Sequence, residues 1–125
     1  RMMARESLVA VIDDDESVRE SLPDLLREFG YAARTFASAE EFLASGDLGR
    51  TGCLILDLAM PGMSGPDLWR ELQRRGQLIP VVFITANGDD TTRPRLIQEG
   101  AVECLFKPFS ETALLTALTA ALRVA

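Results

Sequence analysis

Short apolar runs alternate along this chain with amphipathic stretches. Leu8–Ile12 contains only apolar residues and is followed by three aspartates at 13–15. A short run without polar alternation is typical of a strand buried on both faces, as in a parallel sheet. Three further runs also end at a polar residue, 53–56 at Asp57, 81–84 at Thr85 and 104–106 at Lys107. With a weaker candidate at 31–36, the sequence predicts five strands.

Between these runs the apolar residues follow the period of a helix. Apolar positions from 18 to 29 form one stripe, and Gly30 follows them as a C-terminal cap. Pro23 interrupts this stripe. Because proline lacks the backbone donor that a helix interior needs, we expect a kink or a restart there.

Four more helices are predicted from their start signals. These are a capping box at Ser38–Glu41, Pro66 at a first helical position, Thr91 or Thr92 as a cap with Pro94 in the first turn and Gly100 beyond the end, and Ser110 as a start. The last helix is expected to place one set of apolar residues on a single face: Leu114, Leu115, Leu118, Ala121 and Leu122.

This alternation indicates an α/β fold with a parallel sheet and right-handed crossovers. Five strands and five helices fit a doubly wound, flavodoxin-like sheet in the order 2-1-3-4-5. A chain of 125 residues has the size of one domain. We therefore expect a single domain over 1–125, with residues 1–5 a flexible start or an expression remnant and any output domain beyond residue 125.

Composition narrows the functional classes. No apolar run reaches the ~18 residues of a membrane span, and the N-terminus does not resemble a secretory signal, so we expect a cytoplasmic protein without a membrane partner. The net charge of −6 disfavours direct binding to nucleic acid. The absence of histidine excludes Ser-His-Asp hydrolysis and His-ligated zinc. Cys53 and Cys104 lie in apolar runs and are predicted to be buried free thiols.

The candidate chemistry lies where the strands end, since ligands of such sheets bind outside the carboxyl ends of the strands. Asp15 is interpreted as a cap of the following helix. Capping does not explain Asp13, Asp14 and Asp57 together. Two like charges ~4 Å apart repel by about 4 kcal/mol at an effective dielectric of 20, so a cation is implied. Oxygen ligands favour Mg²⁺, with Mn²⁺ as an alternative.

Thr85 and Lys107 would add a hydroxyl donor and a cation from the two remaining strand ends. Both groups suit the oxygens of a phosphoryl group. A carboxylate nucleophile beside a metal, with charge stabilisation opposite, predicts phosphoryl transfer to an aspartate.

Four motifs in order resemble those of response-regulator receiver domains of two-component systems: VIDDD at 11–15, LILD at 54–57 with MPGMSG at 60–65, ITA at 84–86 and FKPF at 106–109. The resemblance covers nearly the whole chain. It implies that Asp57 is the phosphoacceptor, that Asp14 binds Mg²⁺ directly and Asp13 mainly through water, and that the Ala59 carbonyl is a further ligand. It also implies phosphoryl contacts from Thr85 and Lys107, and a cis Lys107-Pro108 bond.

The same resemblance implies partners. A sensor histidine kinase would be the phosphodonor, and phosphorylation could lead to a homodimer. The motifs are most similar to receivers that precede a helix-turn-helix domain, so DNA would be reached only through such an output domain. A receiver of this kind modifies itself and is not a turnover enzyme.

Two departures and several alternatives accompany this interpretation. The family usually has an aromatic residue where this chain has Cys104, and Pro23 is unusual in the first helix. A haloacid-dehalogenase-like phosphatase needs an aspartate where Ala59 stands, and a flavodoxin or dinucleotide-binding protein needs a different loop after the first strand. The remaining alternative is a receiver-fold interaction module that acts independently of phosphorylation.

Overall fold

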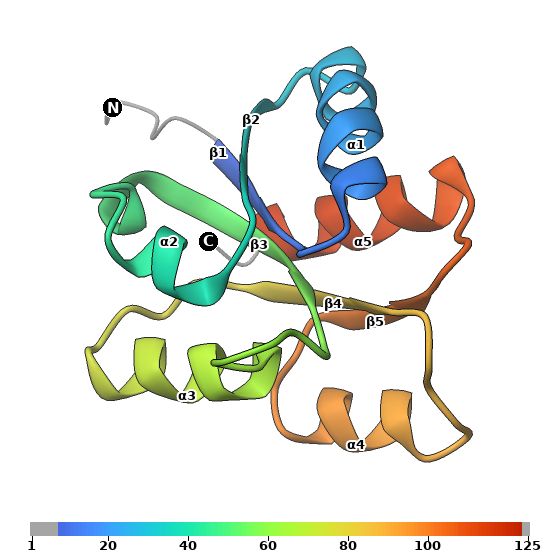
Figure 1. Ribbon diagram of the computed structural model, residues 1–125. Coiled ribbons are helices and arrows are strands. Elements are labelled where there is room, and N and C mark those ends of the chain that lie inside the picture. The colour runs from blue at the N-terminus through green and yellow to red at the C-terminus, as the bar shows by residue number, and fades with distance from the viewer. Residues whose placement is uncertain (1–7, 124–125) are drawn as a thin grey trace.

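A computed structural model describes residues 8–123 as a parallel sheet between two layers of helices (Figure 1). The strands are β1 (Leu8–Ile12), β2 (Ala32–Phe36), β3 (Thr51–Asp57), β4 (Val81–Thr85) and β5 (Glu103–Phe106). The helices are α1 (Glu16–Glu28), α2 (Ala39–Leu43), α3 (Gly65–Arg74), α4 (Thr92–Gln98) and α5 (Glu111–Arg123), with a 3₁₀ turn η1 (Leu48–Arg50). The strand order β2-β1-β3-β4-β5, with every pair parallel, confirms the predicted topology.

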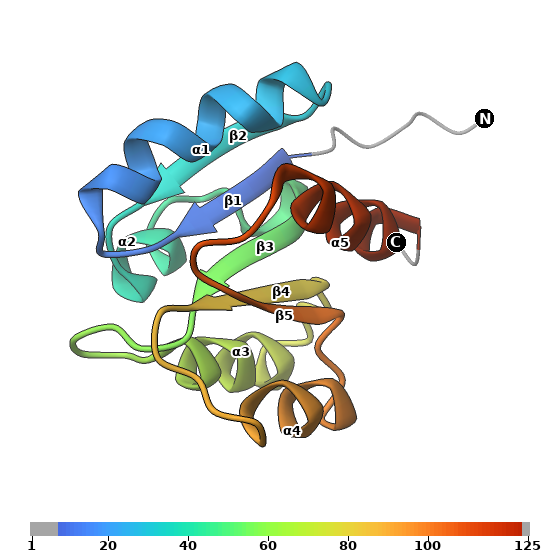
Figure 2. The same cartoon turned by 90° about the vertical axis from the view of Figure 1, so that its right-hand side faces the viewer.

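Each central strand packs on both faces, which explains its unbroken apolar sequence. Val9 and Val11 of β1 join the core under α1 and α5, whereas Ala10 and Ile12 join the core under α2, α3 and α4. Figure 2 shows α1 and α5 on one side of the sheet and α3 and α4 on the other. Because apolar cores cover both faces of the sheet, polar side chains gather at its carboxyl edge.

Two helices start at their predicted caps, whereas the starts of α3 and α4 differ from the prediction. Ser38 and Ser110 accept hydrogen bonds from Glu41 N and Ala113 N, both at 3.0 Å. Helix α3 begins one residue before Pro66, because a capping box between Ser64 and Asp67 fixes its start. Neither predicted threonine caps α4 as expected. The Thr91 side chain makes no capping bond, and its hydroxyl donates to Asp89 Oδ1 at 2.7 Å. The Thr92 hydroxyl accepts from Asp89 N at 3.1 Å, in the loop before the helix.

Two expectations about the helices need correction. Of the kink or restart expected at Pro23, the restart is wrong, since α1 is one helix with Pro23 inside it and hydrogen bonds at both ends, Arg19 N to Asp15 O and Phe29 N to Leu25 O. Leu115 does not share the buried face of α5. The residue is 38% exposed, because the buried face of α5 is formed by Leu114, Ala117, Leu118 and Ala121 and Leu115 lies beyond its edge.

The predicted thiols are confirmed as free and buried at Cys53 and Cys104. Within residues 8–123, none of the helices is long and apolar enough to cross a membrane. The expectation for residues 1–5 falls outside the described part of the chain.

Candidate functional site

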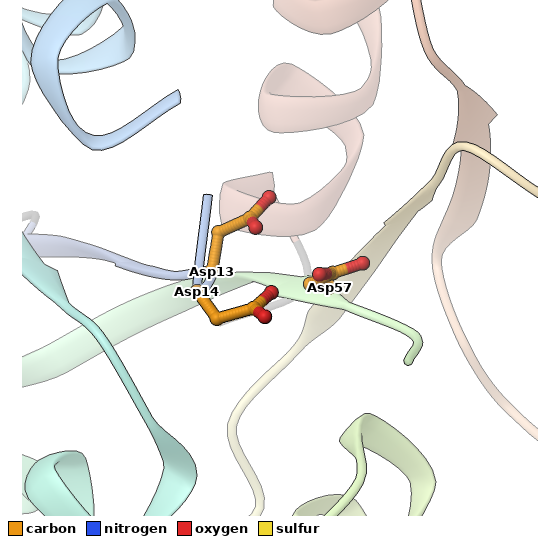
Figure 3. A group of neighbouring side chains, drawn as sticks. All are labelled: Asp13, Asp14 and Asp57. Atoms are coloured by element: carbon orange, nitrogen blue, oxygen red, sulfur yellow. The ribbon is translucent and has the colours of Figure 1, made fainter. Parts of the chain in front are cut away.

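All five side chains predicted from the strand ends come to the carboxyl edge of the sheet. Asp13 and Asp14 directly follow β1, Asp57 and Thr85 are the last residues of β3 and β4, and Lys107 directly follows β5. Each of the three aspartates offers a carboxylate oxygen, and these oxygens lie within 4.8 Å of one another. Figure 3 shows the three side chains side by side at the ends of their strands. Asp13 and Asp57 are buried, whereas Asp14 is exposed.

Burial and neighbouring charge act together on Asp57. Its residue is only 6% exposed. Burial raises the pKa of its carboxyl to about 7, and the charge of Asp13 and hydrogen bonding with Asp13 and Asp14 act in the same direction, against the charge of Lys107. Near neutral pH the Asp57 carboxyl is therefore divided between its protonated and ionised forms, and a bound cation would favour the ionised form. Three oxygen ligands of this kind fit a hard divalent ion.

Lys107 already neutralises one of the acids. Its Nζ donates to Asp13 Oδ2 at 2.8 Å, while Asp13 Oδ1 accepts from Asp15 N at 2.9 Å. Burial lowers the pKa of Lys107, but the hydrogen bond and charge of Asp13 and the charges of Asp57 and Asp15 outweigh it, so that the net pKa is raised. Lys107 thus stays charged beside the carboxylates. The Lys107-Pro108 bond is cis, as the family resemblance implies.

Thr85 is held by the loop that follows it. Its Oγ1 accepts from Asn87 N at 3.1 Å, and its backbone oxygen accepts from Lys107 N at 2.8 Å. The hydroxyl proton remains for an acceptor at the sheet edge. Asp15, by contrast, caps α1 as predicted, with its carboxylate accepting from Ser17 N at 2.9 Å.

Gly65 shapes the site in a way that the sequence did not reveal. A Cβ atom at this position would lie 2.3 Å from the backbone oxygen of Asp57, so the start of α3 can approach the end of β3 only as glycine. Ala59, the predicted backbone ligand, is exposed in the loop between them. Gly65 is the last residue of the MPGMSG motif, but the need for glycine at this position comes from a contact that forms only in the folded chain.

The end of β5 places the small residue Cys104 in the core and the aromatic residue Phe106 near the surface. Cys104 is 1% exposed, is paired with Phe83 in the sheet and belongs to the same core cluster as Leu96. Phe106, which is paired with Thr85 in the sheet register, is 40% exposed. Its ring lies against Gly88, where an added Cβ would come within 2.0 Å of the ring carbon Cε1. The aromatic side chain near Thr85 is therefore at 106 and packs on the β4–α4 loop.

Comparison with known proteins decides the family. The model of the response regulator receiver domain matches residues 9–119. The chain belongs to this family. Response regulator protein TodT of Pseudomonas putida is 43% identical over 124 residues, which cover 99% of this chain and 55% of that protein.

Two further relatives agree. Transcriptional regulatory protein FixJ of Azorhizobium caulinodans is 42% identical over 94% of this chain and 56% of its own length. The solved structure of response regulator StyR has a TM-score of 0.87 and 46% identity, and the match covers 97% of this chain and 61% of that one. The receiver chain therefore spans little more than half the length of the curated relatives it matches.

Proposed function

We propose that this receiver domain accepts a phosphoryl group from a partner histidine kinase onto Asp57 in a Mg²⁺-dependent reaction. The observation that carries the proposal is the cluster of Asp13, Asp14 and Asp57 oxygens within 4.8 Å, with Lys107 bound to its edge. Lys107 neutralises only part of the negative charge of the cluster, and the remaining ligand atoms are the oxygens that Mg²⁺ prefers.

Each side chain at the carboxyl edge of the sheet has a separate role in the proposed reaction. An Asp57 carboxylate oxygen attacks the phosphorus of the kinase phosphohistidine, the new O–P bond forms as the N–P bond breaks, and the released imidazole takes up a proton. Asp14 would hold Mg²⁺ directly, Asp13 through water, and Ala59 through its carbonyl. The bound ion supplies neutralisation of the negative charge shared by Asp57 and the phosphoryl oxygens.

Lys107 and Thr85 complete the proposed site from the other two strands. Lys107 provides a fixed cation that can contact a phosphoryl oxygen from the side of Asp13, and the Thr85 hydroxyl provides a donor. Because the product stays on Asp57 until water hydrolyses it, the domain acts as a signalling switch rather than as a turnover enzyme.

The proposed output is transcription through a C-terminal helix-turn-helix domain outside this chain. Support comes from the relatives, which are named as response or transcriptional regulators and are almost twice as long as the match. With a net charge of −6, the receiver itself is not the DNA-binding part. The proposal includes a cytoplasmic location and a homodimer formed on phosphorylation.

Phosphorylation by a small-molecule donor tests the chemistry without the kinase. Incubation with acetyl phosphate and Mg²⁺ should add one phosphate to the protein, and alkaline pH should remove it, as expected of an acyl phosphate. Asp57→Asn should remain unmodified in the same mass spectrum. A variant that is modified as fully as wild type would show that Asp57 is not the acceptor. A wild-type protein that resists both acetyl phosphate and kinase would favour the phosphate-independent interaction module.

A further inference from the structure

The loop of residues 58–64 connects Asp57 to α3 and carries Ala59, the proposed backbone ligand of the ion. Its start is fixed to the sheet, because Leu58 N donates to Ile84 O at 2.9 Å. Its end is fixed by the Ser64 cap of α3. Between these anchors Met60 is buried in the core, and Gly65 N donates to Leu58 O at 3.2 Å. Only the tip, at Pro61 and Gly62, is exposed. The tip therefore depends on a contact from another element to hold one conformation.

Glu40 of α2 provides such support from outside the loop. Its Oε2 accepts a hydrogen bond from Met63 N at 3.1 Å. The same oxygen would lie 3.0 Å from a Cβ atom added at Gly62, so the carboxylate rests directly against the bare backbone. Gly62 also has a φ of 74°, which favours glycine. The turn at Gly62 and the carboxylate of Glu40 thus fit each other.

Helix α2 is a firm base for this contact although it has only five residues. Ala39 and Phe42 are fully buried, and the Phe42 ring meets the Phe36 ring edge-on with centroids 5.2 Å apart. At the helix start, Ser38 accepts from Glu41 N while the Glu41 carboxylate accepts from Ala37 N. These contacts fix the backbone of Glu40, so its hydrogen bond ties the loop to the β2 side of the sheet.

We propose that Glu40 is a positioning residue for the cation site, which rests on the proposed function. By holding the turn at Gly62 and Met63, it restrains the loop in which Ala59 presents its carbonyl. A loop that is already restrained loses less conformational entropy when it binds the ion, so the ion binds more tightly. Linkage is reciprocal, and bound Mg²⁺ should in turn strengthen the bond between Glu40 and Met63.

Two measurements on Glu40→Ala test this proposal. The Mg²⁺ dissociation constant, obtained from the rise in melting temperature across a MgCl₂ titration, should increase about fivefold, less than the 10- to 100-fold loss seen when direct partners of metal ligands are removed. Hydrogen exchange of the Met63 amide, followed by NMR, should become faster in the variant. Added Mg²⁺ should slow this exchange in wild type more than in Glu40→Ala.

Conservative and matched variants separate positioning from charge. Glu40→Gln keeps an oxygen acceptor and should restore most of the Mg²⁺ affinity and of the Met63 protection. Glu41→Gln removes the same charge from the same helix, and its amide oxygen can still accept from Ala37 N, so the start of α2 is kept. Because the Glu41 carboxylate bonds Ala37 and not the loop, this variant should bind Mg²⁺ like wild type. Gly62→Ala, which presses against the same Glu40 oxygen, should weaken Mg²⁺ binding as Glu40→Ala does.

Three outcomes would overturn the inference. Unchanged Mg²⁺ affinity in Glu40→Ala would show that the loop needs no support. Equal weakening in Glu40→Gln, Glu40→Ala and Glu41→Gln would assign the effect to lost negative charge. A wild-type protein without Mg²⁺-dependent stabilisation would refute the proposed function itself, and the inference with it.

Discussion

The acidic half of the site, at the ends of β1 and β3, and the opposite half, at the ends of β4 and β5, are held by different kinds of contact. Around Asp57, two backbone segments approach closely, since Gly65 lies against the backbone oxygen of Asp57. Around Thr85, a side chain approaches the backbone, since the Phe106 ring lies against Gly88. Backbone contacts cannot yield cheaply, whereas a half-exposed ring can rotate. From this contrast we expect the first half to stay fixed and, in the second, the Phe106 ring and the loop that it contacts to shift more easily.

The largest expected effect tests the acidic half. Asp14→Ala should lose the Mg²⁺-induced rise in melting temperature, because the exposed carboxylate is the proposed direct ligand. In EDTA the variant should melt no lower than wild type, since one source of repulsion with Asp13 and Asp57 is gone. Differential scanning calorimetry in EDTA and in MgCl₂ measures both effects. An undiminished response to Mg²⁺ would remove Asp14 from the ligand set.

How much of the whole site could be predicted from the sequence depends on what each residue contacts. The strand-end positions of Asp13, Asp57 and Thr85 were predictable, because a buried parallel strand reads as an apolar run that stops at its polar edge. The bond between Lys107 and Asp13 was not, since it joins residues 94 positions apart and depends on side-chain conformations. The roles of Gly65 and Glu40 were also missed, because both act on backbone atoms of other elements.

The same limit applies to the helices. Ser38, Asp15 and Ser110 were recognised because a cap is a local contact within three residues. Leu115 and Pro23 were misjudged because the outcome depends on the surface that the helix packs against. Leu115 fits a helical apolar stripe but lies beyond the edge of the buried face of α5, and Pro23 is accommodated inside a helix that tertiary packing holds together.

Two glycine substitutions compare the halves directly. Gly65→Ala should lower the free energy of unfolding by about 3 kcal/mol, because a Cβ atom 2.3 Å from the backbone oxygen of Asp57 would force the start of α3 away from the end of β3. Gly88→Ala should cost about 1 kcal/mol, because the Phe106 ring can swing into solvent. Urea denaturation gives both values.

A double-mutant cycle completes that comparison. Phe106→Ala should relieve most of the cost of Gly88→Ala and none of the cost of Gly65→Ala. If Gly88→Ala costs as much in the Phe106→Ala background as alone, the ring is not what the loop packs against.

The pH dependence of the metal-free protein isolates Asp57. Its pKa is about 7 in the native state and close to its usual 3.8 in the unfolded chain, so the native state binds more protons between these values. In EDTA, stability should therefore fall by about 2 kcal/mol as the pH rises from 5 to 7.5. Asp57→Asn should abolish this fall, and saturating Mg²⁺ should reduce it because the ion competes with the proton.

Asp15→Asn is the matched control for the pH profile. Hydrogen bonds from Ser17 lower the pKa of the exposed Asp15 carboxyl, so its titration is complete below pH 5. The variant should lose stability at every pH above 5 by the same amount, without a change in slope. Should Asp57→Asn keep the wild-type slope, another group would be responsible for it.

The smallest expected effect concerns Cys104 of β5, in the second half of the site. If Thr85 moves toward a bound phosphoryl group, its hydrogen bond from Asn87 N must lengthen, and the loop that carries Gly88 and the Phe106 ring shifts with it. Cys104 is too small to fill a space by rotating, so its exposure should report the shift. Burial raises the pKa of its thiol, with the nearby charge of Glu103 in support, and labelling should be slow in the resting state. In a Cys53→Ala background, beryllofluoride with Mg²⁺ should change the rate of reaction with a thiol reagent about threefold. Equal rates, in a sample where the phosphoryl mimic is shown to be bound, would mean that the β5 side of the core does not sense the switch.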